Sequence, residues 1–126
     1  MSGVCLVGSS SNNTGNVQVN YAGVWGTVCD WRSWTSTWNN QAARVVCRQL
    51  GFLDGKAQYR AAFGERPGVI WLSNMNCIGE ETSLDQCQHR GWRNVDQQCD
   101  HGDDVGVVCG NRGTIICFRS HIFLFT

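Results

Sequence analysis

The sequence lacks an excess of charge of either sign. Lys and Arg total 10, and Asp and Glu total 10, so the formal net charge is zero. A general nucleic-acid-binding domain carries a basic excess, so this balance argues against nucleic acid as a partner. Lysine is almost absent, because Lys56 is the only one and every other basic residue is an arginine. Arginine binds carboxylate, sulfate or phosphate groups through paired hydrogen bonds better than lysine does.

Signatures of catalysis and of membrane insertion are also missing. There is no Gly-x-Ser-x-Gly nucleophile elbow and no phosphate-cradling glycine motif, so we do not expect an enzyme. The first residues do not have the charged and apolar regions of a signal peptide, so for a secreted domain we expect a mature fragment, an excised module or an incomplete gene model. The apolar segment 114–126 is shorter than the roughly 20 residues of a membrane span, and Arg119 interrupts it. We therefore expect membrane association only through a parent chain.

Cysteine, in contrast, is abundant. The chain has eight cysteines, and each of six lies within its own run of strand, helix or turn signals: Cys29, Cys47, Cys77, Cys87, Cys99 and Cys109. This scatter predicts a disulfide framework and therefore an extracellular protein. Two Cys-x-His pairs, Cys87/His89 and Cys99/His101, raise the alternative of zinc, but their spacing matches structural zinc sites poorly.

The hydrophobic pattern predicts several strands around one helix, an α+β arrangement in a single domain. Residues 41–50 form the expected helix, which Asn39 or Asn40 caps and Gly51 ends. Its apolar face consists of Ala43, Val46, Cys47 and Leu50. The expected strands cover residues 17–21, 24–29, 69–72 and 105–109, with a hairpin turn at Ala22-Gly23 and a short helical turn at 83–87. Six tryptophans predict an aromatic-rich core.

Acidic residues cluster near Cys99. Asp100, Asp103 and Asp104 are close together in the sequence, and Asp30 follows Cys29. These carboxylates could bind a hard cation such as calcium if Cys29 and Cys99 were joined. The alternative is that an aspartate caps a turn and pairs with an arginine, and the sequence leaves both readings open.

One further site is a sequon. Asn12-Asn13-Thr14 is an acceptor sequence for N-linked glycosylation, with Asn12 as the acceptor, and it lies in a predicted polar turn. Such tripeptides are frequent by chance, so the sequence makes a glycoprotein plausible and does not require one.

Several motifs occur in an order typical of one family. WGTVCD, VVCRQLG, the AFG…IWL segment, C-x-H-x-GW and DxGVVC follow one another between about Val4 and Cys109. In this order they resemble the scavenger receptor cysteine-rich domain, of the class with six framework cysteines. The resemblance implies a curved antiparallel β-sheet cradling one main α-helix. We expect residues 1–110 to form this domain and residues 111–126 to form a C-terminal extension.

The resemblance also implies a disulfide pairing: Cys29–Cys99, Cys47–Cys109 and Cys77–Cys87. Cys5 and Cys117 are additions to the six-cysteine pattern. They could form a fourth bridge if the first strand and the C-terminal extension lie side by side, or pair with another chain.

Members of the family often bind their ligands with calcium, and Asp30, Asp103 and Asp104 are the expected calcium ligands here. The sequence departs from the family pattern at other acidic positions, which are Asn39, Ala42, Ser73 and Asn74 in this chain. These losses predict a weak calcium site or none.

Members of this family bind ligands rather than catalyse reactions. The resemblance implies a secreted or cell-surface module that recognises polyanions, microbial surfaces or proteins, with a role such as innate immunity. The alternative is a structural module that associates with itself or with partner chains in an extracellular matrix or filament. For ligand binding we expect one exposed patch made of Arg60, Arg66, Arg90 and Arg93. Its rival is local pairing of each arginine with Glu65, Glu80, Glu81, Asp85 or Asp96.

Overall fold

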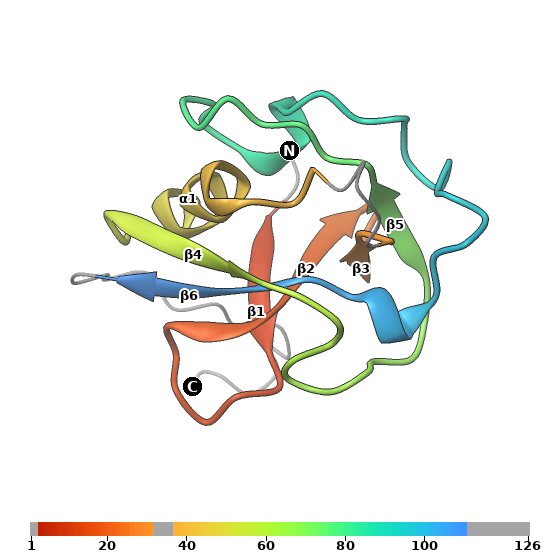
Figure 1. The fold of residues 1–126 in the computed structure, drawn as a ribbon, viewed down its shortest axis with the longest axis horizontal. Coiled ribbons are helices and arrows are strands. Elements are labelled where there is room, and N and C mark those ends of the chain that lie inside the picture. Colours follow the sequence, from red (N-terminus) through yellow and green to blue (C-terminus); the bar gives the residue numbers. More distant parts are fainter. Residues whose placement is uncertain (1–2, 32–36, 111–126) are drawn as a thin grey trace.

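The computed structural model describes residues 3–31 and 37–110, which form one sheet with a helix packed on it (Figure 1). The strands are β1 (Val4–Val7), β2 (Thr14–Tyr21), β3 (Val24–Cys29), β4 (Asp54–Gln58), β5 (Ile70–Ser73) and β6 (Gly106–Gly110). The α-helix is α1 (Asn40–Gln49), and two 3-10 helices are η1 (Leu84–Gln86) and η2 (His101–Asp103).

All six strands belong to one curved sheet with the order β4-β6-β2-β3-β5, and β1 pairs with β2. The expected sheet and single main helix are confirmed, with one difference. The sheet is mixed, because β3 and β5 run parallel while the other pairs are antiparallel. The chain between β3 and β5 passes through α1 and β4, and such a long crossover is the kind of connection that returns a strand in the same direction.

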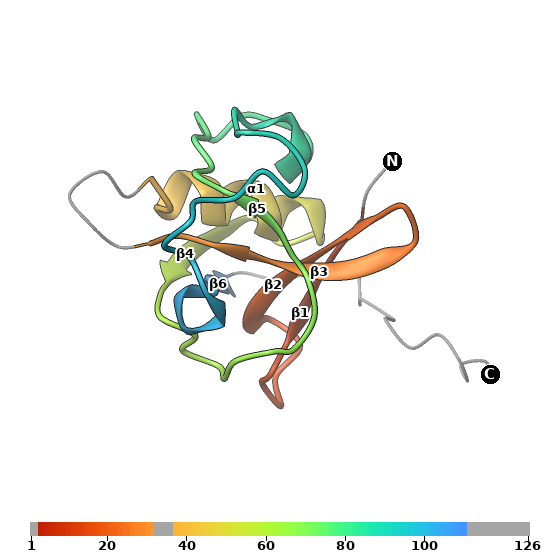
Figure 2. The same ribbon diagram turned by 90° about the vertical axis from the view of Figure 1, so that its right-hand side faces the viewer.

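The helix forms where the sequence predicts it and begins one residue earlier. The side chain of Asn39 accepts hydrogen bonds from the backbone N–H groups of Gln41 and Ala42, at 3.0 and 3.1 Å, so Asn39 is the N-cap. Gly51 follows the helix with a φ of 93°, a left-handed conformation that glycine adopts without strain. The predicted apolar face is buried and packs on β4 and β6 (Figure 2).

Trp38 anchors the start of the helix to the sheet. Its indole N–H donates to the carbonyl of Gly106 at 3.2 Å, and its backbone N–H donates to the carboxylate of Asp30 at 2.9 Å. The expectation of an aromatic-rich core holds only in part. Trp38 and Trp71 are buried, but most of the remaining core is valine and other small apolar side chains, and Trp31 is exposed.

Among the disulfides whose two cysteines are both described, three hold the domain together, and they are the pairs that the family resemblance implies. Cys29–Cys99 joins β3 to the segment before η2, Cys47–Cys109 joins α1 to β6, and Cys77–Cys87 closes a loop of its own. Cys5 is buried on β1. Cys117 and the expected extension at 111–126 lie outside the described residues.

The strand β4 is absent from the sequence-based prediction. Its sequence Asp-Gly-Lys-Ala-Gln has no alternation of apolar residues, because Asp54 and Lys56 face solvent at the edge of the sheet. Pairing with β6, rather than burial of its own side chains, makes this segment a strand. Within the described residues, no helix has the length and apolar character needed to cross a bilayer.

Gly55 is expected to be intolerant of a side chain. A Cβ at this position would overlap Sγ of Cys47 and lie 3.2 Å from the carbonyl oxygen of Ala43, so it would push β4 away from α1. We expect Gly55→Ala to lower the free energy of unfolding by about 1–3 kcal/mol, measured by urea denaturation of the oxidised protein. Gly110→Ala is the matched control, because no atom of the described residues lies within 4 Å of its Cβ. Equal stability of the two variants would contradict this packing argument.

Candidate ligand-binding surface

Arg90 and Arg93 lie in a tight turn that is attached to the edge of β5. The backbone N–H of Asn94 donates to the carbonyl of Gly91 at 3.1 Å, and the Asn94 side chain donates to the carbonyl of Arg90 at 2.9 Å. The backbone N–H of Arg93 donates to the carbonyl of Trp71 in β5 at 2.7 Å. Both arginines are exposed. Their guanidinium groups are therefore carried into solvent by a backbone that is fixed at several points.

Three residues of the candidate patch region have left-handed backbones. Arg60, Ala61 and Arg93 have φ values of 55°, 49° and 65°. This conformation costs a non-glycine residue roughly 1–2 kcal/mol, so other interactions have to hold it. The N–H of Ala61 donates to the carbonyl of Asp104 at 2.8 Å, and Arg93 has its bond to Trp71. Residues held in this way cluster at functional sites, which makes both arginine segments candidate binding surfaces.

The four expected arginines lie on two different segments, the loop after β4 and the turn at the edge of β5. Arg60 is exposed on the loop after β4, which is bonded to Asp104. Arg66, on the same loop, is half-buried, and one of its terminal nitrogens lies 3.1 Å from the position that a Cβ on Gly8 would take. Arg90 and Arg93 are held at β5 instead. Arg66 therefore offers less of its guanidinium group to a ligand than the other three.

Local ion pairing of these arginines is the rival interpretation. Among the described residues, the ion pairs within 4 Å are Arg44–Asp54 and His101–Asp104, and neither contains an arginine of the expected patch. Several of the acids that could have been partners accept hydrogen bonds from their own loops. Glu81 accepts from Ile78 and Gly79, Asp85 from Ser83, and Asp96 from Gln98.

An aromatic cluster lies beside Arg93, and sequence reasoning did not find it. The rings of Tyr21 and Trp92 are stacked, with centroids 4.1 Å apart and planes 13° apart. Trp71 meets both rings edge-on, at 5.2 and 6.2 Å. Tyr21 ends β2 and Trp92 lies seventy-one positions later, so only the sheet topology brings them together.

The three expected calcium ligands are near one another but serve the fold. Asp30 is buried and accepts from Trp38, while Asp103 accepts from the N–H of Asp100 at 3.2 Å in a capping box. Asp104 is fully buried and bonded to His101. The two asparagines at changed family positions are also engaged, because Asn39 caps α1 and Asn74 accepts from Ser73. Each of the three carboxylates thus accepts a hydrogen bond from within the protein, which competes with the converging oxygen cage that calcium needs.

The described part of the chain also has no suitable group of side chains for binding zinc. There, the one group of three metal-binding side chains within reach of a shared ion is Cys77, Glu81 and Cys87. Both sulfurs of this group are joined in a disulfide. Cys99 of the second Cys-x-His pair is likewise bonded to Cys29.

His101 is the titratable group with the most defined surroundings. One ring nitrogen, Nδ1, lies 3.0 and 3.2 Å from the two carboxylate oxygens of Asp104, and the other, Nε2, lies 2.8 Å from the carbonyl of Gly68. Only the imidazolium can donate to both acceptors at once. Burial alone would lower the pKa of His101, but the bonds to Gly68 and Asp104 and the charges of Asp104 and Glu65 outweigh it and raise that pKa above 6.5. Burial raises the pKa of Asp104, against the opposing effects of His101 and Thr27.

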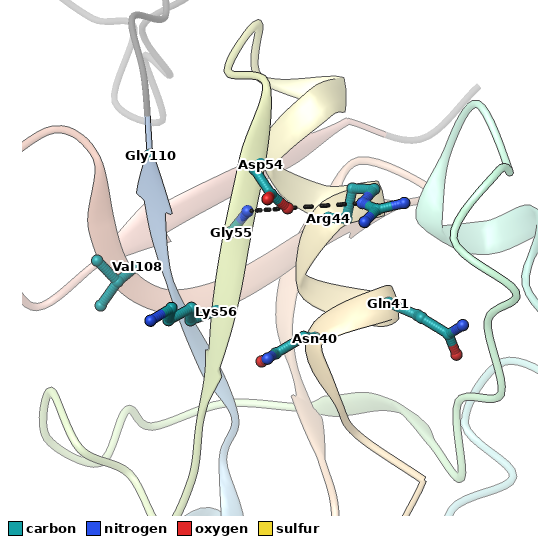
Figure 3. Close-up of a pocket in the computed structure, with 8 residues that line it drawn as sticks. All are labelled: Asn40, Gln41, Arg44, Asp54, Gly55, Lys56, Val108 and Gly110. Atoms are coloured by element: carbon teal, nitrogen blue, oxygen red, sulfur yellow. Dashed lines mark hydrogen bonds and ion pairs between the residues drawn. The ribbon is translucent and has the colours of Figure 1, made fainter.

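A hollow beside the helix is a poor candidate for a ligand site. It has a volume of about 560 Å³ and lies between the first turn of α1 and the β4–β6 edge. Figure 3 shows that Lys56 points away from Arg44, on the opposite side of β4. Arg44 itself faces Asp54 at 3.5 Å. The charged groups therefore do not converge on one anion.

The sequon lies at the surface. Asn12 is exposed in the turn between β1 and β2, and Thr14 begins β2, where its hydroxyl donates to Ser9. The acceptor side chain is therefore accessible in the folded protein.

Comparison with known proteins gives consistent results. The model of the scavenger receptor cysteine-rich domain family matches residues 7–110. The chain is 43% identical over 107 residues to the human CD5 antigen-like protein, an alignment that covers 82% of this chain and 29% of that protein. It is 44% identical over 110 residues to the mouse galectin-3-binding protein, covering 86% and 18% of the two chains. The chain thus spans less than a third of the length of these relatives.

Two solved structures share the fold. The dimeric form of the SRCR domain of mouse MARCO superposes with a TM-score of 0.67 at 39% identity, covering 81% of this chain and 91% of that one. The third SRCR domain of murine neurotrypsin gives a TM-score of 0.73 at 34% identity, covering 86% and 96%. Both matches cover more than 90% of the solved domains, so the described residues have the fold of this type of domain.

The stability of the domain should fall as pH rises past the pKa of His101. The folded pKa is raised, so the stabilisation by the imidazolium is fully present below about pH 6.5, the value of an unfolded histidine, and is lost as pH rises through the folded pKa. Urea denaturation between pH 5.5 and about pH 8.5 should show this decline, and Asp104→Asn should flatten it. His89→Gln is the control and should keep the decline. A wild-type profile that is flat, or that rises with pH, would contradict the assignment.

Calcium binding should be weak or absent. Because the carboxylates of Asp30, Asp103 and Asp104 each accept hydrogen bonds from protein donors, we expect no affinity tighter than about 10⁻⁴–10⁻³ M in a calorimetric titration. Asp103 is the least buried of the three, so Asp103→Asn should remove any weak signal that is present. Micromolar affinity would mean that backbone carbonyls or other side chains complete a site.

Proposed function

The chain belongs to the scavenger receptor cysteine-rich family, and on this premise we propose that it is an extracellular module that binds polyanionic ligands through Arg90 and Arg93. The observation that carries the proposal is the pair of exposed arginines on a fixed turn, neither of which forms an ion pair within the described residues. Such guanidinium groups are available to an external anion at little cost in lost internal contacts. Each offers a planar fork of donors to sulfate, phosphate or carboxylate.

The extracellular assignment is supported by covalent chemistry. Three disulfides persist in an oxidising compartment, and they would be reduced in the cytosol. An exposed sequon at Asn12 fits the same compartment, so a glycan at Asn12 is part of the proposal. A role in innate immunity would follow if the natural polyanion is a microbial surface polymer.

Arg60 extends the proposal to a second contact. It is exposed, it has a left-handed backbone, and its loop is bonded to Asp104, the residue after η2. A polymeric ligand can reach separate arginines at once, so the surface need not be one continuous patch. Arg66 completes the expected set as a weaker contributor, because its guanidinium group is packed against the β1–β2 turn.

Binding, rather than catalysis, is the activity that the described residues support. The two candidate clusters of titratable groups, around Asp104 and around Glu81, are engaged in internal hydrogen bonds. The Lys56–Arg44 hollow does not gather its charges around a reacting group (Figure 3). The relatives named as lysyl oxidase homologs are matched over only 12–14% of their length.

An assembly role is the second candidate function. The observation in its favour is Trp31, an exposed tryptophan at the start of the loop that follows β3. Trp38, at the other end of that loop, is buried and offers nothing to a partner. Among the described residues no cysteine is a free thiol, so covalent pairing with another chain has less support than noncovalent association. Size-exclusion chromatography under non-reducing conditions distinguishes a monomer from an assembly.

Removal of both arginines should weaken polyanion binding. Charged hydrogen bonds contribute about 1.5–3 kcal/mol each, so we expect Arg90→Ala/Arg93→Ala to lower the affinity for dextran sulfate by at least about tenfold. Wild-type affinity should also fall steeply between about 0.05 and 0.5 M salt, because exposed charges are screened. Isothermal titration calorimetry at several salt concentrations measures both effects.

The control is Arg44→Ala/Lys56→Ala, which removes the same total charge from the side of α1 and β4. It should bind dextran sulfate nearly as well as the wild type. If the Arg90/Arg93 variant binds normally and without salt dependence, the arginine surface is not the binding site and the assembly role becomes the better explanation.

A further inference from the structure

We propose that Tyr21 and Trp92 form a stacking platform that makes this surface selective for anionic polysaccharides over other polyanions. The inference rests on the proposed function, because it concerns the same surface and adds the chemical class of its ligand. Charge alone would bind any polyanion. The aromatic platform adds a flat apolar contact that only a ligand with rings can use.

The platform is built from two separate parts of the chain, and both of its rings contact Trp71. Tyr21 is the last residue of β2, and Trp92 lies in the Arg90–Asn94 turn. Their stacked rings are 4.1 Å apart, and both meet the edge or face of Trp71 at nearly perpendicular angles. Trp71 is buried and fixed, because its indole N–H donates to the carbonyl of Val24 at 2.8 Å. The platform is therefore positioned before any ligand arrives.

The platform is accessible to solvent. Tyr21 is 40% exposed, and Val24, which pairs with it across the β2–β3 hairpin, is 50% exposed. A Cβ on Gly23, at the tip of this hairpin, would meet no atom within 4 Å. Figure 2 shows the hairpin projecting beyond the body of the sheet. Tyr21 and Val24 thus remain in contact with water at a projecting edge that a long polymer can reach.

The turn that carries the two arginines and the two platform rings all contact Trp71. Arg93 follows Trp92 directly in the sequence, and its backbone is bonded to Trp71, the residue that lies against both platform rings. Arg90 is at the other end of the same turn. The backbones of both arginines therefore belong to the same local structure as the aromatic rings.

This combination is complementary to a sulfated or carboxylated sugar chain. A pyranose ring has an apolar face of C–H groups that carry partial positive charge, and the face of an aromatic ring carries partial negative charge. Sulfate and carboxylate groups project from the edges of such sugars, where guanidinium groups bind them in pairs. A flexible vinyl polyanion has the same charges without the ring faces, so it would use only the arginines.

Single-stranded nucleic acid is the main alternative, since it also combines stacking rings with anionic groups. It normally binds to grooves with a basic excess, whereas this chain has zero net charge and two arginines at the platform. The observations therefore favour the polysaccharide, and an oligonucleotide serves as a competing probe in the test.

The test compares two probes that carry the same anionic group. Dextran sulfate has sugar rings, and polyvinyl sulfate has none. Titrated at one salt concentration, Tyr21→Ala should lose about three- to tenfold in affinity for dextran sulfate, the size expected for one aromatic contact. It should bind polyvinyl sulfate within about twofold of the wild type, because the arginines are intact. Tyr21→Phe should resemble the wild type with both probes.

Leu53→Ala is the matched control, since Leu53 is an exposed apolar residue outside the platform, and it should bind both probes normally. Trp92→Phe keeps an aromatic ring and should retain most of the dextran sulfate affinity. Thermal unfolding of each variant verifies that the fold is intact.

The two levels of the proposal fail in different ways. If Tyr21→Ala binds dextran sulfate normally, or loses equal affinity for both probes, the platform does not select sugar rings, although the arginine surface stands. If a single-stranded oligonucleotide binds more tightly than dextran sulfate at equal salt, the assignment to polysaccharide is overturned. If instead Arg90→Ala/Arg93→Ala leaves the binding of both sulfated probes unchanged, the proposed function itself fails.

Discussion

The junction between the end of β3 and residues 99–105 determines where the other parts of the domain lie. The Cys29–Cys99 disulfide makes it covalent, and three hydrogen-bonded contacts follow it: Asp30 N–H to Asp103, Val105 N–H to Val28, and the bridge between Cys29 and Asp104. A native bridge of this kind typically stabilises a small secreted domain by about 2–5 kcal/mol. Its structural effect is larger than that figure suggests, since the loop after β4 and the start of α1 are both attached to residues of this junction.

These attachments explain why the acidic residues are present. Asp30 holds the backbone of Trp38 at the entry to the helix, and Asp104 holds His101, which in turn binds the carbonyl of Gly68. A buried carboxylate is costly unless donors surround it, so these side chains are committed to the fold. The same sequence cluster that suggested a cation site is thus a set of structural hydrogen-bond acceptors.

The sequence predicted those features that depend on local signals. The helix at 40–49 has a cap, an apolar face and a terminal glycine, and each signal lies within a few residues of the others. The three disulfides followed from the order of whole motifs and could not have followed from spacing. Two features escaped prediction because they depend on distant segments. The strand β4 exists through its pairing with β6, and the Tyr21–Trp92 stack exists through the sheet that brings the β2–β3 hairpin next to β5.

The candidate surface lies on a loop whose ends and middle are fixed by residues other than its exposed side chains. The segment that carries Arg90, Trp92 and Arg93 lies between Cys87 and Cys99, and both of these cysteines are held in disulfides. Its ends are therefore fixed by covalent bonds, and the bond from Arg93 to Trp71 fixes its middle. Because the frame does not depend on the exposed side chains of this segment, those side chains can change at little cost to stability. Ligand preference can therefore vary on this loop while the disulfides, the helix and the sheet stay the same.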